Sequence, residues 1–175
     1  IFKKITVIPE GKNHGLVFLL DWSGSMNNIL ENTMKQLFNL VWFCRKVNIP
    51  FEVYAFTNDS WSLDPDTEGL RPYDIKPDRL VNEIKQGALH IEGGFRMVNI
   101  LTSTAKTKDL DRMMLNLWLQ VRSFRGAMYN YARKFTLSGT PLNEAIVSTG
   151  QLTKRLIKTS KLQKCHVIVL TDGEA

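Results

Sequence analysis

Cysteine and histidine are scarce in this chain, and their placement excludes several kinds of site. Two cysteines, Cys44 and Cys165, occur among 175 residues, and each lies within an apolar pattern. We therefore expect buried thiols rather than a disulfide, as in proteins of a reducing compartment. The three histidines, His14, His90 and His166, share no spacing typical of a metal site. Neither a zinc module nor catalysis by a cysteine nucleophile is indicated.

Long hydrophobic runs are also lacking. No apolar segment approaches the roughly 20 residues that cross a bilayer, and residues 2–9 form a short strand-like segment rather than a signal peptide. A length of 175 residues suits one domain with a sizeable core. We expect a single cytoplasmic domain over residues 1–175, without membrane association.

Acidic residues are few between Lys85 and Gly139. Glu92, Asp109 and Asp111 stand there against nine lysines and arginines, so this segment carries the whole formal charge of +6. One interpretation is an electropositive surface for nucleic acid or an acidic partner. The other is a solvated helical face with a basic bias, and it is favoured because no nucleic-acid motif accompanies the charges.

Two hydrolase signatures are missing from the segment Asp21-Trp22-Ser23-Gly24-Ser25. Ser23 stands where an Asp-x-Asp phosphatase would have its second aspartate, and the Ser-Gly-Ser run lacks the Gly-x-Ser-x-Gly spacing of a nucleophile elbow. We therefore expect no intrinsic catalysis.

The first half of the chain alternates between strand and helix patterns. Residues 16–20 form a buried apolar run, residues 30–47 repeat apolar side chains every three to four positions, and residues 51–56 read as a second strand. A strand–helix–strand unit implies a right-handed crossover and parallel strands. The sequence thus predicts an α/β fold, Rossmann-like and three-layered, with a mostly parallel central sheet and helices on both faces.

The second half is less regular. We expect a loop at residues 57–77, a short edge strand at residues 88–91, and a helix over residues 95–124. Pro141 opens a further helix with Thr140 as its cap, and its apolar stripe includes Ile146. Residues 165–170 are a continuous apolar run, which is typical of a central parallel strand.

Oxygen-bearing side chains follow the ends of these strands. Asp21, Ser23 and Ser25 come directly after the first strand, Thr140 lies in a loop before a helix, and Asp172 follows the last strand. Ligands of open α/β sheets bind beyond the carboxyl ends of the strands, so we expect these loops to converge. Hydroxyl and carboxylate oxygens suit Mg²⁺, although Asp and Ser are also ordinary turn and cap residues.

The pattern resembles the von Willebrand factor A (vWA) domain and its metal-ion-dependent adhesion site (MIDAS). That signature is Asp-x-Ser-x-Ser, then a distant Thr, then an Asp, and it matches Asp21, Ser23, Ser25, Thr140 and Asp172. The resemblance implies that the serines and the threonine bind Mg²⁺ directly, with Mn²⁺ as a substitute. It implies that the aspartates bind directly or through water.

A closer resemblance is to the vWA domain of cobaltochelatase-like subunits and of related proteins from tailed bacteriophages. It is carried by residues 37–46 and by Gly139-Thr140-Pro141-Leu142-Asn143-Glu144-Ala145. Against that pattern, residues 60–136 are interpreted as a helical insertion. The family's strands after the Thr-Asp-Gly segment are missing, so we interpret the chain as a partial domain of a longer polypeptide.

The resemblance implies a Mg²⁺-dependent protein-interaction module. A partner's Glu or Asp would complete the coordination of the metal, and the family works beside an AAA+ ATPase. The alternative is a non-catalytic subunit of a cobalt or magnesium chelatase that inserts a metal into a tetrapyrrole. Either role implies a cytoplasmic protein, in the host cytoplasm if the chain is phage-encoded.

Overall fold

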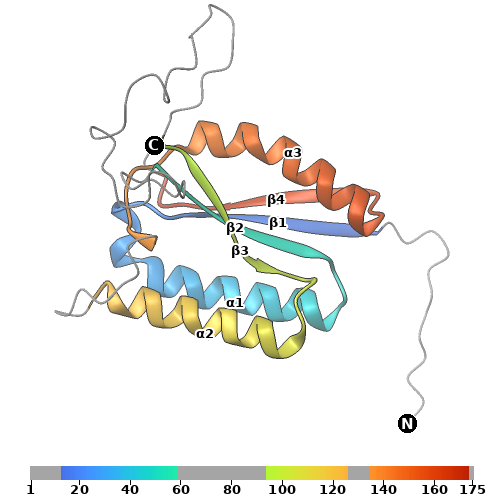
Figure 1. Ribbon diagram of the computed structural model, residues 1–175, viewed down its shortest axis with the longest axis horizontal. Coiled ribbons are helices and arrows are strands. Elements are labelled where there is room, and N and C mark those ends of the chain that lie inside the picture. The colour runs from blue at the N-terminus through green and yellow to red at the C-terminus, as the bar shows by residue number, and fades with distance from the viewer. Residues whose placement is uncertain (1–12, 59–93, 126–134, 174–175) are drawn as a thin grey trace, which may run out of the picture.

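The structure is a computed structural model that describes residues 13–58, 94–125 and 135–173. Figure 1 shows these residues as a sheet with helices on both of its faces. In the described part of the chain, no helix is long and apolar enough to span a membrane.

The sheet has four strands in the order β3-β2-β1-β4. β1 (His14–Asp21) pairs in parallel with β2 (Phe51–Thr57) on one side and with β4 (Lys164–Leu170) on the other. β3 (Arg96–Thr102) runs antiparallel to β2 at the edge. The predicted α/β fold with a mostly parallel sheet is therefore confirmed.

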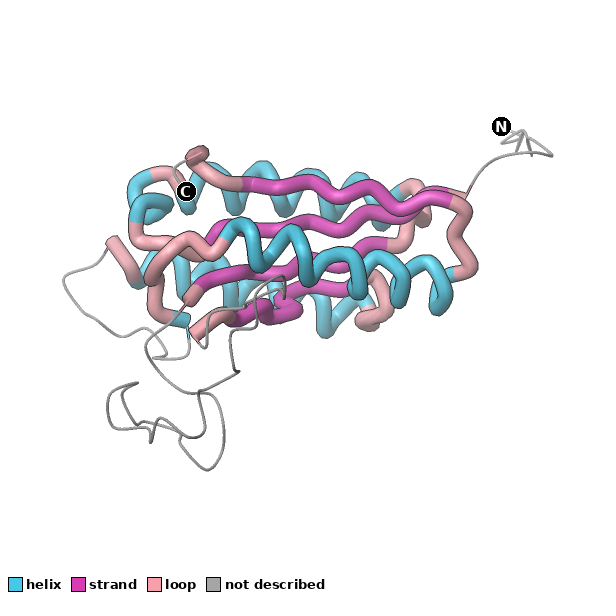
Figure 2. The backbone as a smooth tube through the Cα atoms, turned by 90° about the horizontal axis from the view of Figure 1, so that it is seen from above, coloured by secondary structure: helices cyan, strands magenta, loops and turns pink. Residues whose placement is uncertain are grey.

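Three α-helices cover the two faces of this sheet. α1 (Leu30–Lys46) and α2 (Thr107–Ser123) lie side by side on one face, and α3 (Leu142–Ser160) lies on the other (Figure 1). Viewed from above, α3 crosses over the strands (Figure 2). A short 3₁₀ helix, η1 (Ser25–Asn28), connects the end of β1 to α1.

β1 separates two hydrophobic cores because successive strand side chains point to opposite faces. Phe18 and Leu20 pack in the core shared with α1 and α2. Val17 and Leu19 pack in a smaller core on the α3 side. All four side chains are fully buried, which explains why the strand reads as a continuous apolar run.

The prediction of a helix over residues 95–124 is wrong for its first third. Residues Arg96–Thr102 form β3, and α2 begins only at Thr107. Val98 and Leu101 have helical spacing, but they pair with Ala55 and Val53 across a register shift in the β2–β3 ladder. Backbone hydrogen bonding to β2 thus decided between two conformations that a short apolar run permits.

The helical insertion predicted at residues 60–136 is described only in part. Its described residues form β3 and α2, which pack on the sheet, so they are not purely helical. The predicted edge strand at residues 88–91 lies outside the described residues, as does the predicted loop at residues 57–77 except for its first two positions.

β4 differs from the predicted central strand. In the described part of the chain it pairs only with β1, and the side chains of Val167 and Val169 are 42% and 37% exposed. Cys165 on this strand is only partly buried, whereas Cys44 is fully buried as predicted. Both thiols are free, in agreement with the expected lack of a disulfide.

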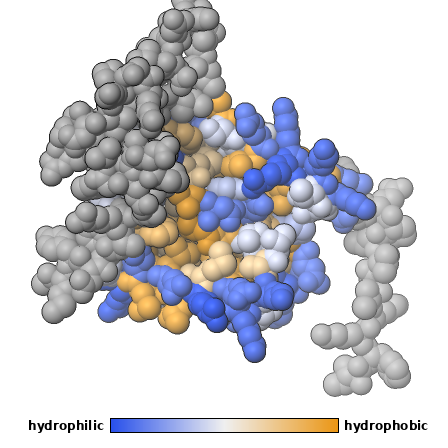
Figure 3. Space-filling view, in the orientation of Figure 1, coloured by the Kyte–Doolittle hydropathy of each residue, from blue (hydrophilic) through white to orange (hydrophobic). Residues whose placement is uncertain are grey.

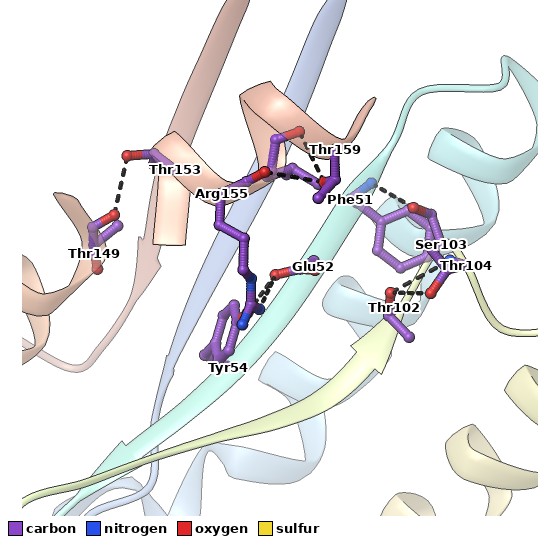
Figure 4. Close-up of polar contacts among 11 residues, drawn as sticks. Phe51, Glu52, Tyr54, Thr102, Ser103, Thr104, Thr149, Thr153, Arg155 and Thr159 are labelled. Carbon is purple, nitrogen blue, oxygen red and sulfur yellow. Dashed lines mark hydrogen bonds and ion pairs between the residues drawn. The ribbon is translucent and has the colours of Figure 1, made fainter. Parts of the chain in front are cut away.

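A polar cluster fastens α3 to the sheet (Figure 4). The Arg155 guanidinium lies 3.0 Å from the Glu52 carboxylate on β2, and both groups contact the hydroxyl of Tyr54. Burial, together with the neighbouring Glu52 carboxylate, raises the pKa of Tyr54 to about 12.

Ile146 on α3 was predicted to belong to the apolar stripe of this helix. Its side chain is 53% exposed, so its prediction as a core residue is wrong.

Candidate metal centre

The end of β1 is anchored by Trp22. Its backbone N–H donates to the Phe56 carbonyl at 2.9 Å, and its indole N–H donates to the Phe135 carbonyl at 2.9 Å. The ring also makes edge contacts with Phe124 and Phe135. These contacts hold Trp22 in the core, so its two neighbours in the chain, Asp21 and Ser23, are held at the sheet edge.

Asp21 is fully buried, and its two carboxylate oxygens differ in their surroundings. Oδ2 accepts a hydrogen bond from the Thr171 hydroxyl at 2.8 Å. Oδ1 is buried and has no hydrogen-bond partner among the described residues. Leaving such an oxygen unpaired costs about 1–3 kcal/mol, and more for a charged group. The structure thus contains a buried carboxylate oxygen without a hydrogen-bond partner among the described residues, in the same segment as the two serines of the motif.

The electrostatics of Asp21 point the same way. Burial raises its pKa, and the nearby charge of Asp172 raises it further, although hydrogen bonds from Ser23 and Thr171 act in the opposite direction. The cost of burying the carboxylate thus outweighs the stabilisation of its charged form by these hydrogen bonds. A cation beside Oδ1 would offset that cost.

The two serines of the motif lie together. The hydroxyl oxygens of Ser23 and Ser25 are 3.0 Å apart; Ser23 is buried and Ser25 is exposed at the start of η1. The residues of the motif therefore lead from a buried carboxylate to a solvent-facing hydroxyl.

The loop that carries Thr140 meets this segment through its backbone. The Gly24 N–H donates to the Ser138 carbonyl at 2.7 Å, and the Ser138 N–H donates to the Trp22 carbonyl at 3.3 Å. Ser23 and Ser138 thereby form an isolated parallel bridge, with half-buried Thr140 two residues further on. A Cβ at Gly139 would overlap the end of the Asn58 side chain, so a larger residue here requires that side chain to move.

The structure does not support Thr140 as a side-chain cap of α3. The helix begins at Leu142, its cap position is Pro141, and no side-chain hydrogen bond caps it. It is the backbone carbonyl of Thr140 that accepts a bond, from the Leu142 N–H at 2.8 Å.

Asp172 lies beyond the end of β4 and is exposed. Its neighbour Thr171 makes the direct link to the site, since its hydroxyl donates to Asp21 and accepts from the Gly173 N–H at 3.2 Å. The structure thus holds Asp21, Ser23 and Ser25 close together: the two serine hydroxyls are in contact, and Asp21 lies two residues before Ser23 in the same segment. Thr140 and Asp172 are brought near through the neighbouring residues Ser138 and Thr171.

These residues fit a hard cation. They offer carboxylate and hydroxyl oxygens with no nitrogen or sulfur, which suits Mg²⁺ or Mn²⁺. Among the described residues there is no group of three or more His, Cys, Asp and Glu side chains. Any cation at this position would therefore depend largely on hydroxyl oxygens for its coordination.

Sequence reasoning missed two residues that shape this site, Trp22 and Thr171. Trp22 was treated as the variable position of the motif, and Thr171 as the end of a strand. A threonine immediately before Asp172 was the available signal, because its hydroxyl is well placed to orient a neighbouring carboxylate. The indole contact could not be found, since Phe135 is distant in the chain.

The two described histidines are not part of the site. His14 and His166 stack on each other at the opposite end of β1 and β4, with ring nitrogens 2.9 Å apart, and His90 lies outside the described residues.

Comparison of the chain with protein-family models, with curated proteins and with solved structures found no match.

Proposed function

We propose that this chain is a vWA-type domain whose MIDAS-like site binds Mg²⁺ and, with it, an acidic side chain of a protein partner. One observation carries the proposal: Oδ1 of buried Asp21 lacks a partner among the described residues and belongs to the same short segment as the paired Ser23 and Ser25 hydroxyls. A buried carboxylate oxygen without a hydrogen-bond partner destabilises the metal-free fold, and a bound cation would offset that cost.

The proposed ligands are Ser23, Ser25 and Thr140, with Asp21 and Asp172 binding directly or through water. When bound, Mg²⁺ supplies a hard positive charge that prefers oxygen ligands and keeps several waters. The chain's own side chains orient the site and keep it accessible. Thr171 orients the Asp21 carboxylate, and the exposed position of Asp172 leaves the outer side of the site accessible to a partner.

The proposed partner is a protein that offers a glutamate or aspartate, and an AAA+ ATPase is the candidate that the resemblance supports. We also propose that the protein is cytoplasmic and has no intrinsic catalytic activity. In the chelatase-type alternative, the same module would serve as a non-catalytic subunit.

Isothermal titration with MgCl₂ or MnCl₂ tests the first step. We expect one site in the wild-type chain and no measurable binding by Asp21→Ala or Thr140→Ala. Thr104→Ala, which alters a threonine in the β3–α2 connection, is the matched control and should bind normally. Wild-type affinity in both site variants would refute the proposal.

The partner step needs a separate measurement. Binding of a cognate AAA+ ATPase by biolayer interferometry should require Mg²⁺, disappear with EDTA, and be lost in Asp21→Ala. Binding that is equally strong with EDTA would show that the contact does not use the metal.

A further inference from the structure

The outer surface between α1 and α2 contains an apolar groove that the metal site does not use. It has a volume of about 610 Å³. Phe38 and Met114 line it as nearly buried side chains, while Trp42 and Leu115 are 52% and 55% exposed. Figure 3 shows hydrophobic residues reaching the surface among hydrophilic ones on the side of α1 and α2. Large side chains that remain exposed together in one groove mark an interaction surface.

The groove has the dimensions of a helix-binding site. Its lining residues recur at positions 35, 38 and 42 of α1 and at positions 111, 114 and 118 of α2. The two helices run antiparallel, because Arg45 pairs with Asp111 at one end and Glu31 pairs with Arg122 at the other. Seven residues of helix rise about 10 Å. A partner helix with apolar anchors at i, i+3 or i+4, and i+7 matches that length.

The charge around the groove selects the partner. Residues 30–46 and 106–125 together hold eight lysines and arginines and three carboxylates. At one end, the single carboxylate of Glu31 lies within 4.0 Å of three cations, on Lys35, Arg122 and Arg125. Lys35 also lies over the Trp118 ring, with its amine 5.5 Å from the ring centroid. Five of the eight lining residues are apolar, and the charged ones, Lys35 and Asp111, lie at the two ends of the groove, where Asp111 is paired with Arg45. The surroundings of the groove therefore carry an excess of positive charge, while its middle is apolar.

We infer that this groove binds an acidic amphipathic helix of a protein partner, with apolar side chains between α1 and α2 and carboxylates beside the surrounding basic residues. A second copy of the same surface would bring like charges together, which opposes self-association. Nucleic acid would match the charge, but its phosphates would gain nothing from Phe38, Met114 and Leu115.

The test uses the full chain and a fluorescein-labelled peptide of about 15 residues, long enough to form a helix. The peptide carries Leu and Trp at i, i+3, i+4 and i+7 and mostly Glu elsewhere. One control peptide has the same composition in an order that spreads the apolar residues around the helix. A second has Lys in place of Glu. Fluorescence anisotropy measures the affinities, in EDTA so that the metal site does not contribute.

We expect saturable binding of the acidic peptide that weakens with added NaCl, and binding at least about tenfold weaker for both control peptides. Trp42→Ala and Leu115→Ala should each weaken binding about tenfold with unchanged circular dichroism. Ile146→Ala, at a residue equally exposed on α3, should have no effect. Asp21→Ala should bind the peptide normally, which separates this inference from the proposed metal function.

Three results would overturn the inference. Equal binding of the rearranged peptide, or unchanged binding by Trp42→Ala, would show that the groove does not recognise a helix. Oligo(dT) that displaces the acidic peptide and binds more tightly, with loss in Trp42→Ala, would assign the surface to single-stranded nucleic acid. A dimer in light scattering that dissociates in Trp42→Ala would assign it to a second copy.

Discussion

Replacing Asp21 by asparagine should stabilise the chain without Mg²⁺ and abolish its stabilisation by Mg²⁺. The wild-type carboxylate is fully buried, and burial raises its pKa above the ordinary value. A group with a raised pKa in the folded state contributes stability below its ordinary pKa, and that contribution is lost as the pH rises through the folded value. At neutral pH in EDTA, the charged Asp21 therefore destabilises the fold.

The magnitude follows from the unpaired oxygen. A buried unsatisfied group costs about 1–3 kcal/mol, and more when it is charged. Asparagine has the same shape and no charge, but its amide also lacks a full set of partners. We therefore expect a gain of about 1 kcal/mol, which raises the melting temperature of a domain of this size by about 2–4 °C.

Magnesium should reverse the order of stability of the wild type and Asp21→Asn. At a concentration of about 100 times its Kd, Mg²⁺ stabilises the folded state by about 2.7 kcal/mol, provided that it does not bind the unfolded chain. For the wild type this corresponds to a rise of about 5–10 °C. Asp21→Asn should show no rise, so the two melting curves exchange order between EDTA and Mg²⁺.

Differential scanning fluorimetry at neutral pH, in EDTA and across a Mg²⁺ series, measures both effects. Asp109→Asn is the matched control because it removes an exposed carboxylate from the first turn of α2. It should lose a few tenths of a kcal/mol to about 1 kcal/mol and keep the full response to Mg²⁺. Lower stability of Asp21→Asn in EDTA, or an undiminished Mg²⁺ response, would refute the reasoning.

Three further predictions concern the contacts around the sheet. Thr171→Val should weaken Mg²⁺ binding about tenfold in calorimetry because it removes the hydrogen bond to the site carboxylate, whereas Thr171→Ser should bind like the wild type. Gly139→Ala should lose about 0.5–1.5 kcal/mol in urea unfolding, since the Asn58 side chain must leave its rotamer to make room for the methyl group. Gly150→Ala, with open space around it, is the control and should not lose stability. Tyr54 has a pKa of about 12 in the folded chain and about 10 when unfolded. Between those pH values, the free energy of unfolding of the wild type should therefore fall about 1.4 kcal/mol per pH unit faster than that of Tyr54→Phe. Curves of unfolding free energy against pH that run parallel for the two proteins would contradict the buried hydroxyl.

The local elements were predictable wherever one periodicity dominated. β1, α1 and β2 lie within one or two residues of their predicted positions, because buried strands and amphipathic helices carry distinct repeats. The segment of β3 was predicted as helix because Val98 and Leu101 are three residues apart, a helical spacing that the register shift in the β2–β3 ladder accommodates in a strand. Only the hydrogen bonds to β2 distinguish the two, and they come from residues more than 40 positions away.

The candidate site, too, was predictable from the sequence only in part. Asp21, Ser23 and Ser25 form one short segment, so their proximity follows from the sequence. The approach of the other loops was expected from the rule that parallel strands end at the same edge of a sheet. That rule predicts which edge the loops share but no individual contacts. It could not show that Ser138 bridges to Ser23 or that the Thr171 hydroxyl donates to Asp21.

The sequence by itself determined the class of the fold and the oxygen chemistry of the candidate metal centre, because both depend on residue type and short-range spacing. Only the tertiary structure decided that Oδ1 of Asp21 has no partner among the described residues, that β4 has β1 as its only neighbour there, and that α1 and α2 enclose a groove. Each depends on side chains that meet across a large sequence separation. Burial and register of that kind arise only when the whole chain packs.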